Sequence, residues 1–391
     1  MKKHIIAVTV LQLAALTAFS TSSHGGIMVG GVEVTPGLQV EESHNDNIFA
    51  QETVKKSSWI TTIDPALVVK AVDGANEYEL GYRYSRGIFH SSHNDDYSDH
   101  FIGADMLLDL TSRLNVIGWA DYNRTHDMRG TTFTGLPITF NTPDKYHETI
   151  VGSRVEYGQN ARVEFSGEYS NKRYDNHRTI TQTRDLDTIG GIAQFSYPIA
   201  PKTSAVIEAR YTRFNYKFFS PTTNLDSAEQ RYYAGLDWEA TAKTTGTVRV
   251  GYLSKNFSNA ALTDSSSVGW ELGILWEPLT YSSWTLEGSS TALETDGTGS
   301  YTKSVGGSLT WNHGWAEHLS HTAMVGYHEN KFQGLAITRK DQVTTAGASV
   351  NYELMRWLTV GAGYNYADRN SNAANASYRQ NVWSLTLTGT L

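Results

Sequence analysis

The amino-acid sequence predicts an all-β fold, a transmembrane antiparallel up-and-down β-barrel of about 18 strands that follows a cleaved signal peptide. Three observations lead to this prediction. The chain starts with an export signal, apolar and polar residues then alternate along it, and the connections between the alternating segments are short and long in turn. In a soluble sandwich the apolar faces would meet in a dry core, whereas in a membrane barrel they would face lipid. Strand length and the asymmetry of the connections distinguish these two folds.

The N-terminus has the composition of a secretory signal peptide. Lys2 and Lys3 precede the uncharged and mostly apolar run Ile5–Phe19, and the small residues Ala18 and Ser20 end it. A basic head, an apolar core and small residues at the cleavage point are typical of such signals. The run is shorter than the roughly 20 residues of a membrane-spanning helix. We therefore expect residues 1–20 to be removed and residues 21–391 to form one barrel domain.

The composition of the chain restricts its class. It contains no cysteine, so disulfides and thiolate metal sites are excluded. A formal net charge of −8 excludes the basic surface that a nucleic-acid partner requires. The chain is rich in glycine (34) and tyrosine (22), yet only 39% hydrophobic. This combination is typical of strands whose apolar side chains face lipid instead of a large core.

Apolar and polar residues alternate with a period of two along each predicted strand. In the stretch EYELGYRYS, Tyr78, Leu80 and Tyr82 share one face, and Glu79 and Arg83 share the other. The predicted strands lie near residues 31–43, 57–71, 76–90, 97–112, 114–127, 146–158, 160–175, 184–198, 203–217, 227–240, 244–258, 264–277, 282–294, 300–312, 318–332, 338–353, 355–368 and 376–391. Soluble strands have roughly 5–6 residues, while a tilted strand needs roughly 9–11 to cross a bilayer. The length and the even number of the predicted strands favour a bacterial membrane barrel.

The connections alternate between two kinds. DGAN after Val72 and GQN near Gly158 are tight, whereas HSSHNDDYSD from His90 and the segment Met128–Lys145 are longer and polar. Short turns on the periplasmic side and long loops on the outside are typical of porins.

Aromatic residues mark both ends of the predicted strands. Trp276 and Tyr352 stand near short turns, and Tyr84 and Tyr252 stand near long loops. Such positions match the two aromatic girdles at the membrane interfaces. Unpaired backbone groups in hydrocarbon cost several kcal/mol each, so an open sheet is excluded and the first strand is expected to pair with the last.

A barrel of this size is wide enough for an aqueous channel, and its polar register would point inward. The candidate pore-lining residues are Glu79, Arg83, Glu148, Arg154, Arg162, Glu164, Glu208, Arg210, Arg231, Arg249 and Glu271. Opposed charges across a channel would set its ion selectivity. Alternatively, these side chains pair with cross-strand neighbours and only stabilise the wall. The sequence leaves both interpretations open.

Passage of sugars would use aromatic planes. Trp119, Tyr233 and Trp357 fall on the inward register of the predicted strands and are the sugar-stacking candidates. A register error of one residue would turn them toward lipid.

The sequence carries no recognisable catalytic or metal-binding motif. G-x-S-x-G, H-E-x-x-H and phosphate-binding glycine loops are absent. The stretch His90–His100 is dense in carboxylates and imidazoles, but it lacks the spacing of an EF-hand loop and is interpreted as a solvated surface loop. We therefore expect no enzyme activity, no cofactor and no metal site.

The N-terminal third of the mature chain resembles a family of β-barrel porins associated with exopolysaccharide biosynthesis. VTPGLQVEESHNDNIF followed by SSWITTIDPALVV carries the likeness: a first strand with Pro36, the turn Asp46–Phe49, and a second strand with Pro65. His44 stands where a tyrosine is expected. The resemblance implies export of a polysaccharide through the bacterial outer membrane, together with inner-membrane and periplasmic assembly proteins. From the residues alone, the Asp46–Phe49 segment is a structural turn.

The expected function is therefore that of an outer-membrane conduit for an exopolysaccharide, with outer-membrane lipid and the polysaccharide or an oligosaccharide as partners. The alternative is a general or oligosaccharide diffusion porin, which would form a constantly open pore. A third class, a structural or adhesive surface barrel, would have a lumen filled by loops or side chains.

Overall fold

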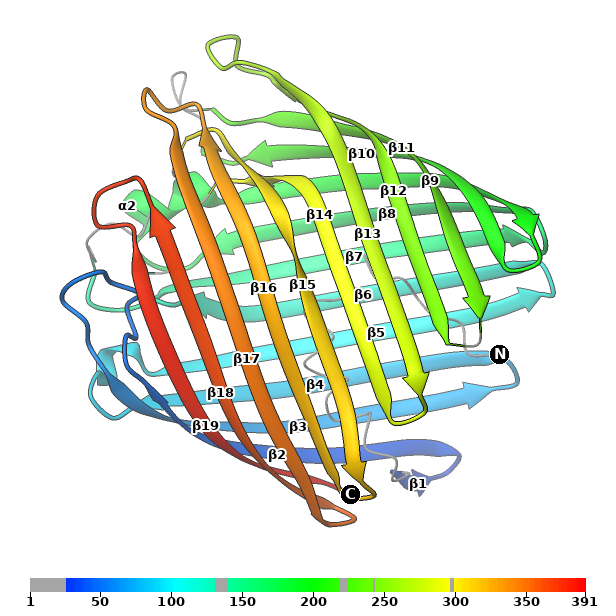
Figure 1. Cartoon of the computed structure of the whole chain (residues 1–391), viewed down its shortest axis with the longest axis horizontal. Helices are drawn as coiled ribbons and strands as arrows, with labels where there is room; N and C mark the ends of the chain where they lie inside the picture. Colours follow the sequence, from blue (N-terminus) through cyan, green and yellow to red (C-terminus); the bar gives the residue numbers. More distant parts are fainter. Residues whose placement is uncertain (1–25, 131–139, 219–223, 242, 296–298) are drawn as a thin grey trace.

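The computed structural model describes residues 26–130, 140–218, 224–241, 243–295 and 299–391. The expected signal peptide, residues 1–20, lies outside the described residues. The described part is one antiparallel sheet of 19 strands, whose short first strand β1 (Ile27–Val29) forms a hairpin with the start of β2. The other eighteen strands form the wall of a barrel (Figure 1).

The wall strands follow one another in sequence order around the barrel. They are β2 (Val32–Asn45), β3 (Ser58–Asp73), β4 (Asn76–Phe89), β5 (Tyr97–Thr111), β6 (Leu114–Asp127), β7 (Asp144–Gly158), β8 (Arg162–Tyr174), β9 (Leu186–Ala200), β10 (Thr203–Tyr216), β11 (Ser227–Thr241), β12 (Thr244–Phe257), β13 (Ser265–Leu279), β14 (Ser282–Glu294), β15 (Tyr301–Ala316), β16 (Leu319–Gln333), β17 (Arg339–Met355), β18 (Leu358–Ser371) and β19 (Tyr378–Thr390). The predicted fold class, strand number and up-and-down order are confirmed.

The last strand closes the barrel by pairing with the first strand of the wall. β19 runs antiparallel to β2 from Val382 opposite Asn45 to Thr390 opposite Gly37. This seam leaves no sheet edge to face hydrocarbon, where unpaired backbone groups would be costly.

The Asp46–Phe49 turn ties the extracellular end of the seam together. Asp46 accepts hydrogen bonds from the backbone N–H and the side-chain amide of Asn381 at 2.8 and 2.6 Å. The fully buried Asn47 donates its amide to the carbonyls of Arg379 and Gln51 at 2.9 and 2.8 Å. The side-chain oxygen of Asn47 accepts a hydrogen bond from the backbone N–H of Gln51 at 3.0 Å. The structural role predicted for this turn is thus the one it has.

Asn47→Ala is expected to destabilise the barrel by about 1–3 kcal/mol, because it leaves buried backbone groups without partners. The measurement is urea unfolding of the refolded protein in lipid vesicles. The control is Asn372→Ala, since Asn372 makes similar bonds to Thr338 and Lys340 in an exposed loop. Equal stability losses in both variants would contradict a special role for Asn47.

The two ends of the barrel differ. Connections such as residues 74–75, 112–113, 201–202 and 356–357 are tight turns, and β1 and the C-terminus lie at this end (Figure 1). The other end carries long connections, among them residues 46–57 and 175–185. Short turns identify the periplasmic end and long loops the extracellular end. None of the described helices has the length and apolar character needed to cross a membrane.

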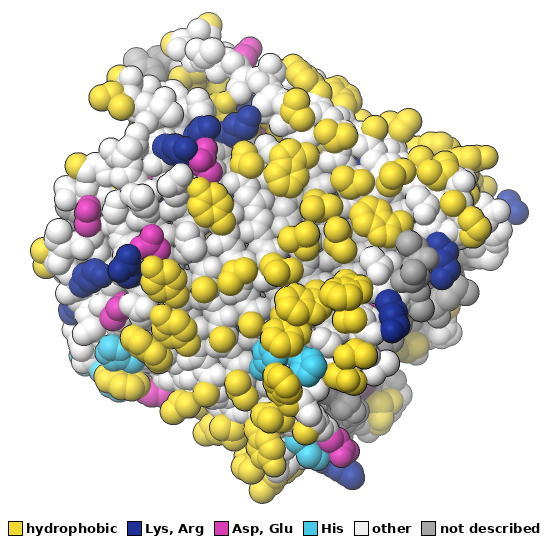
Figure 2. All heavy atoms as spheres, in the orientation of Figure 1, with side chains coloured by type: hydrophobic (Ala, Val, Ile, Leu, Met, Phe, Trp, Pro, Cys, Tyr) yellow, Lys and Arg dark blue, Asp and Glu magenta, His cyan; other side chains and the backbone are white. Residues whose placement is uncertain are grey.

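The outer surface is apolar along the wall. Leu385 (63%) and Ile207 (67%) are examples of large apolar side chains that are exposed on the outward register. Figure 2 shows hydrophobic side chains spread over the face formed by the later strands, with charged side chains gathered mainly toward its margins. Near the periplasmic end, Trp284 and Trp311 stack with ring centroids 5.0 Å apart. The exposed apolar band with aromatics at its ends is the surface expected to contact lipid.

Candidate functional site: the barrel interior

The strand register turns all eleven predicted charged residues toward the interior. On β4, for example, Tyr78, Leu80 and Tyr82 are exposed on the outside, so Glu79 and Arg83 point inward. The paired registers extend this alternation around the wall to the other nine positions. Whether these side chains line a path for ions or solutes stays a prediction.

The inward arginines of β10–β12 are held by carboxylates. Arg210 makes two hydrogen bonds to Glu271, at 2.8 and 2.9 Å, and a further one to Glu208. Arg231 bonds Glu229 at 2.6 Å. In this part of the wall, cross-strand pairing of charges is therefore realised. Buried guanidinium groups are stable only with such partners.

A third salt-bridged arginine completes this charged sector. Arg249 lies 2.7 Å from Asp237 and donates to the carbonyls of Leu236 and Val248 at 3.1 and 3.2 Å. Its side chain crosses Gly235, where a Cβ atom would stand 2.7 Å from its Cδ. A glycine is needed there because any side chain would displace the arginine.

Tyr233 is not available for sugar stacking. Its side chain is only 2% exposed, and a Cβ at Gly269 would meet its hydroxyl at 2.7 Å. The guanidinium of Arg210 lies over the ring at 5.2 Å. The tyrosine therefore points inward and fills the space over Gly269, so its ring is covered and does not present a face to the interior.

The other two sugar-stacking candidates differ from each other. Trp119 points inward, packs over Gly152 and donates its indole N–H to Glu168 at 3.0 Å. Trp357 is not in a strand: it lies in the turn between β17 and β18 at the periplasmic end and is 48% exposed. The register argument therefore does not apply to Trp357, whereas Trp119 keeps a place on the inner wall.

An acidic sector faces the interior from β4–β6. Glu79 and Asp105 stand directly opposite each other on neighbouring strands, and Asp121 lies on the next strand. Asp105 and Asp121 form no hydrogen bond or ion pair within the described residues. Like charges opposite each other repel, so this sector requires water around it. It gives the interior a negative face.

The extracellular half of β14 separates from β13, which the sequence did not predict. Pairing of β13 with β14 ends at Trp270 and Ser290, although β13 continues to Ser265. Beyond that point, β14 and β15 pack on the inner face of earlier strands: Tyr301 bonds Ser265, and its ring lies 6.2 Å from that of Phe257. The upper part of this hairpin therefore leans over the interior.

The leaning hairpin is held by a buried lysine. Lys255 on β12 is fully buried, bonds Glu294 at the end of β14, and lies 4.1 Å over the ring of Phe214. Glu294 also accepts from the hydroxyl of Tyr216 at 2.7 Å. Lys255 lies on the inward register of β12, but its contact with Glu294 depends on a strand far away in the sequence and was not predicted.

Lys255→Met is expected to release the hairpin and raise the single-channel conductance, because Glu294 then loses its charged partner and favours water. The measurement is current through the purified protein in planar bilayers. The control is Lys331→Met, whose ammonium makes an exposed ion pair with Glu329. An unchanged conductance in the Lys255 variant would show that the hairpin does not restrict the channel.

The extracellular loops are joined to one another by polar contacts. Arg129 makes two bonds of 2.5 Å to Asp95 in the helix η1 (His93–Asp95), and its guanidinium lies 4.4 Å over the ring of Phe49. Three loops thereby meet at one point. The stretch His90–His100, considered above for metal binding, is the turn after β4, the helix η1 and the start of β5. The described residues contain no cluster of ligands suited to a metal ion.

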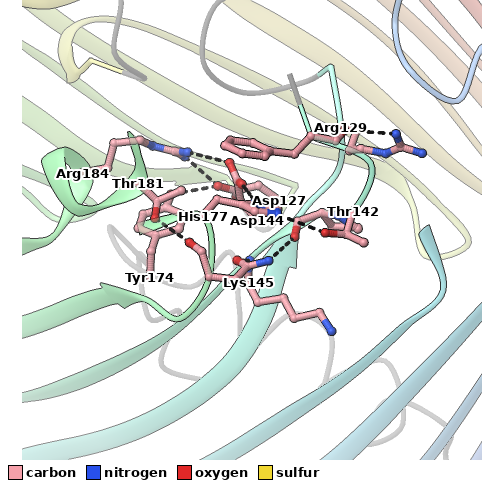
Figure 3. Close-up of polar contacts among 12 residues, drawn as sticks. Asp127, Arg129, Thr142, Asp144, Lys145, Tyr174, His177, Thr181 and Arg184 are labelled. Atoms are coloured by element: carbon pink, nitrogen blue, oxygen red, sulfur yellow. Dashed lines mark hydrogen bonds and ion pairs between the residues drawn. The ribbon is translucent and has the colours of Figure 1, made fainter. Parts of the chain in front are cut away.

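A second contact joins the connections on either side of β7 and β8 (Figure 3). Arg184, in the helix η2 (Gln182–Arg184), bonds Asp127 at 2.6 Å and Asp144 at 3.3 Å, and His177 lies 2.7 Å from Asp144. His177 precedes the short helix α2 (Arg178–Thr181). The hydrogen bond from Arg178 to Asp185 raises the pKa of the Arg178 guanidinium. Sequence periodicity gave no indication of these contacts.

Comparison with known proteins identifies the family of this barrel. The sequence matches the family described as "Putative beta-barrel porin 2" over residues 23–391. A comparison with curated proteins finds no match. Among solved structures, OccK5 (OpdH) of Pseudomonas aeruginosa is similar, with a TM-score of 0.50 and 10% identity over 92% of this chain and 98% of that chain.

A second solved structure is a variant of the ferric enterobactin receptor (PfeA) of Pseudomonas aeruginosa in complex with enterobactin. It has a TM-score of 0.50 and 8% identity over 93% of this chain and 82% of that chain. At these identities the likeness is one of fold. The matched family is described as one of porins, and the second neighbour is a receptor. The chain belongs to the family "Putative beta-barrel porin 2" and is a porin-like β-barrel of the bacterial outer membrane.

Proposed function

We propose that the barrel is a passive conduit through which an exopolysaccharide crosses the outer membrane. The observation that carries the proposal is the polar inward register of a closed wall of eighteen strands. Barrels of 16–18 strands enclose an aqueous channel. In the described part of the chain, the elements outside the wall, β1, η1, α2 and η2, belong to its two ends (Figure 1).

The likeness of the first strands to porins associated with exopolysaccharide biosynthesis supports a polysaccharide as cargo. A passive conduit has no energy source of its own, so inner-membrane and periplasmic assembly proteins would deliver the polymer. The leaning β14–β15 hairpin supports a restricted channel that such partners open.

Deletion of the gene tests the proposal. We expect surface polysaccharide to fall and polymer to accumulate in the periplasm, with both effects reversed by the wild-type gene. Polysaccharide is measured as sugar released from washed cells and from the periplasmic fraction. Unchanged surface polysaccharide in the deletion strain would overturn the proposal.

The second candidate is a diffusion porin for small solutes or oligosaccharides. The similarity of fold to OccK5, which this chain matches over 98% of that chain, supports it. Current through the wild-type protein in planar bilayers separates the two functions. A large, constantly open pore without any partner favours diffusion, and a mostly closed pore that Lys255→Met opens favours export.

A further inference from the structure

We propose that the inner wall formed by β15–β19 binds an uncharged glycan, so that the cargo of the channel is a neutral sugar chain and not a polyanion. This inference rests on the proposed conduit function and adds the chemical class of its substrate. It is carried by the distribution of charge and of free hydroxyl groups around the interior.

The inward side chains of β15–β19 are uncharged over most of their length. Asp, Glu, Lys and Arg occur on the inward register of these strands only at the ends: Arg339, Asp341 and Arg369 at the extracellular end, and Glu353 at the periplasmic end. Between them the wall presents mainly hydroxyl and amide groups, together with the imidazole of His328 and the apolar side chains of Met324, Val343 and Val382. We call this surface the neutral sector; its hydroxyls include Ser308, Thr310, Thr345, Ser349, Ser384 and Thr386.

These six hydroxyl groups have no side-chain hydrogen-bond partner within the described residues, and all six side chains are partly exposed. In the channel they are bonded to water, which a sugar hydroxyl can replace at little net cost. Many such weak and equivalent contacts allow a chain to slide, because no single contact holds it.

Glycines make the neutral sector shallow. Thr345, Ser384 and Thr386 lie beside glycines of neighbouring strands: a Cβ at Gly326, Gly363 or Gly361 would stand 2.6, 2.8 or 2.3 Å from their hydroxyl oxygens. The hydroxyls therefore lie low over the sheet, and Met324 and His328 are the larger inward side chains of β16 beside them. On β10–β13 the corresponding glycine trough is filled by Tyr233 and Arg249.

The opposite wall disfavours a polyanion. β6 and β15 are nine strands apart in a ring of eighteen, so the acidic sector with Asp105 and Asp121 lies across from β13–β15 and faces the neutral sector at its β15 edge. The inward arginines Arg210, Arg231 and Arg249 are already occupied by carboxylates. A polyanion would meet repulsion on one side and uncharged groups on the other, and rejection by like charge is a common source of specificity.

The experiment compares two sugars of equal length as blockers of the current in planar bilayers. Maltohexaose is neutral, and hexagalacturonate carries one carboxylate per residue. We expect maltohexaose to interrupt the current of the protein, with the Lys255→Met background used if the wild-type channel is closed. We expect hexagalacturonate to bind at least about tenfold more weakly, which corresponds to about 1.4 kcal/mol.

Variants show which residues bind maltohexaose and which residues disfavour hexagalacturonate. Thr345→Val, Ser349→Val and Thr386→Val in one chain should weaken the block by maltohexaose several-fold. Thr344→Val is the matched control, because Thr344 is on the outward register of the same strand. Asp105→Asn with Asp121→Asn should strengthen the block by hexagalacturonate and leave that by maltohexaose unchanged.

Stronger block by hexagalacturonate than by maltohexaose would overturn the inference, as would an unchanged maltohexaose block in the triple valine variant. Either result would leave the conduit function intact. In contrast, unchanged surface polysaccharide in the deletion strain would overturn export and leave the binding of neutral sugars standing. The two failures are therefore distinguishable.

Discussion

Leu385→Pro is expected to prevent assembly of the barrel. Leu385 lies in the middle of β19, between Ala362 of β18 and Glu42 of β2. Proline removes a backbone donor from a strand that is paired on both sides and is tolerated essentially only at sheet edges. In hydrocarbon the freed carbonyl costs several kcal/mol. The folded fraction is measured as the species that migrates differently on a denaturing gel before and after heating.

Leu385→Ala is the matched control for this variant. It keeps the backbone donor and removes only part of a side chain that is 63% exposed on the outer surface. We expect it to fold and to show the wild-type heat-dependent migration. A Leu385→Pro protein that assembles in the outer membrane with the wild-type yield would contradict closure of the barrel through the β19–β2 seam.

Arg210→Met is expected to lower the free energy of unfolding by about 3–5 kcal/mol, because it leaves the buried Glu208 carboxylate without its charged partner and removes both hydrogen bonds to Glu271. The side chain of Glu208 is 5% exposed and that of Glu271 26%. Both carboxylates bond Arg210 from neighbouring parts of the wall. The measurement is urea unfolding in lipid vesicles, followed by tryptophan fluorescence.

Two further variants make this prediction specific to the buried charge. Arg379→Met removes an arginine that is 63% exposed and lies 3.2 Å from Asp368, so we expect a much smaller loss of stability, because ion pairs in water contribute little. Glu208→Gln and Glu271→Gln added to Arg210→Met should restore much of the stability. Similar losses for Arg210→Met and Arg379→Met would contradict the role assigned to the buried cluster.

The strands of the wall could be predicted from the sequence because each one has its own alternating pattern of apolar and polar residues. Residues 114–127 and 282–294 were predicted as strands and agree with β6 and β14. Period-two alternation and the length needed to cross a bilayer act within each segment, so no knowledge of neighbours is required. The prediction failed where the signal is short: the hairpin of β1 has three residues, although Gly30 and Gly31, both with positive φ, mark its turn.

The interior could be predicted only in part. Register alone pointed all eleven charged residues inward, but the burial of the Tyr233 side chain depends on Gly269 in another strand. The turn lies at Arg356 and Trp357, two residues later than the sequence indicated, so Trp357 is not part of the wall. Likewise, the leaning hairpin follows from where β13 and β14 stop pairing. These features depend on the relation between strands, which periodicity within one strand does not contain.

Cysteine accessibility along β17 tests most directly that the apolar face touches lipid and the polar face surrounds water. The chain has no cysteine of its own, so single cysteines at residues 345–350 report one position each. In vesicles, a charged thiol reagent should label positions 345, 347 and 349, and lipid-borne nitroxides should quench a probe at 346, 348 and 350. Equal labelling of both sets, or quenching at the first set, would contradict a water-filled barrel in the membrane.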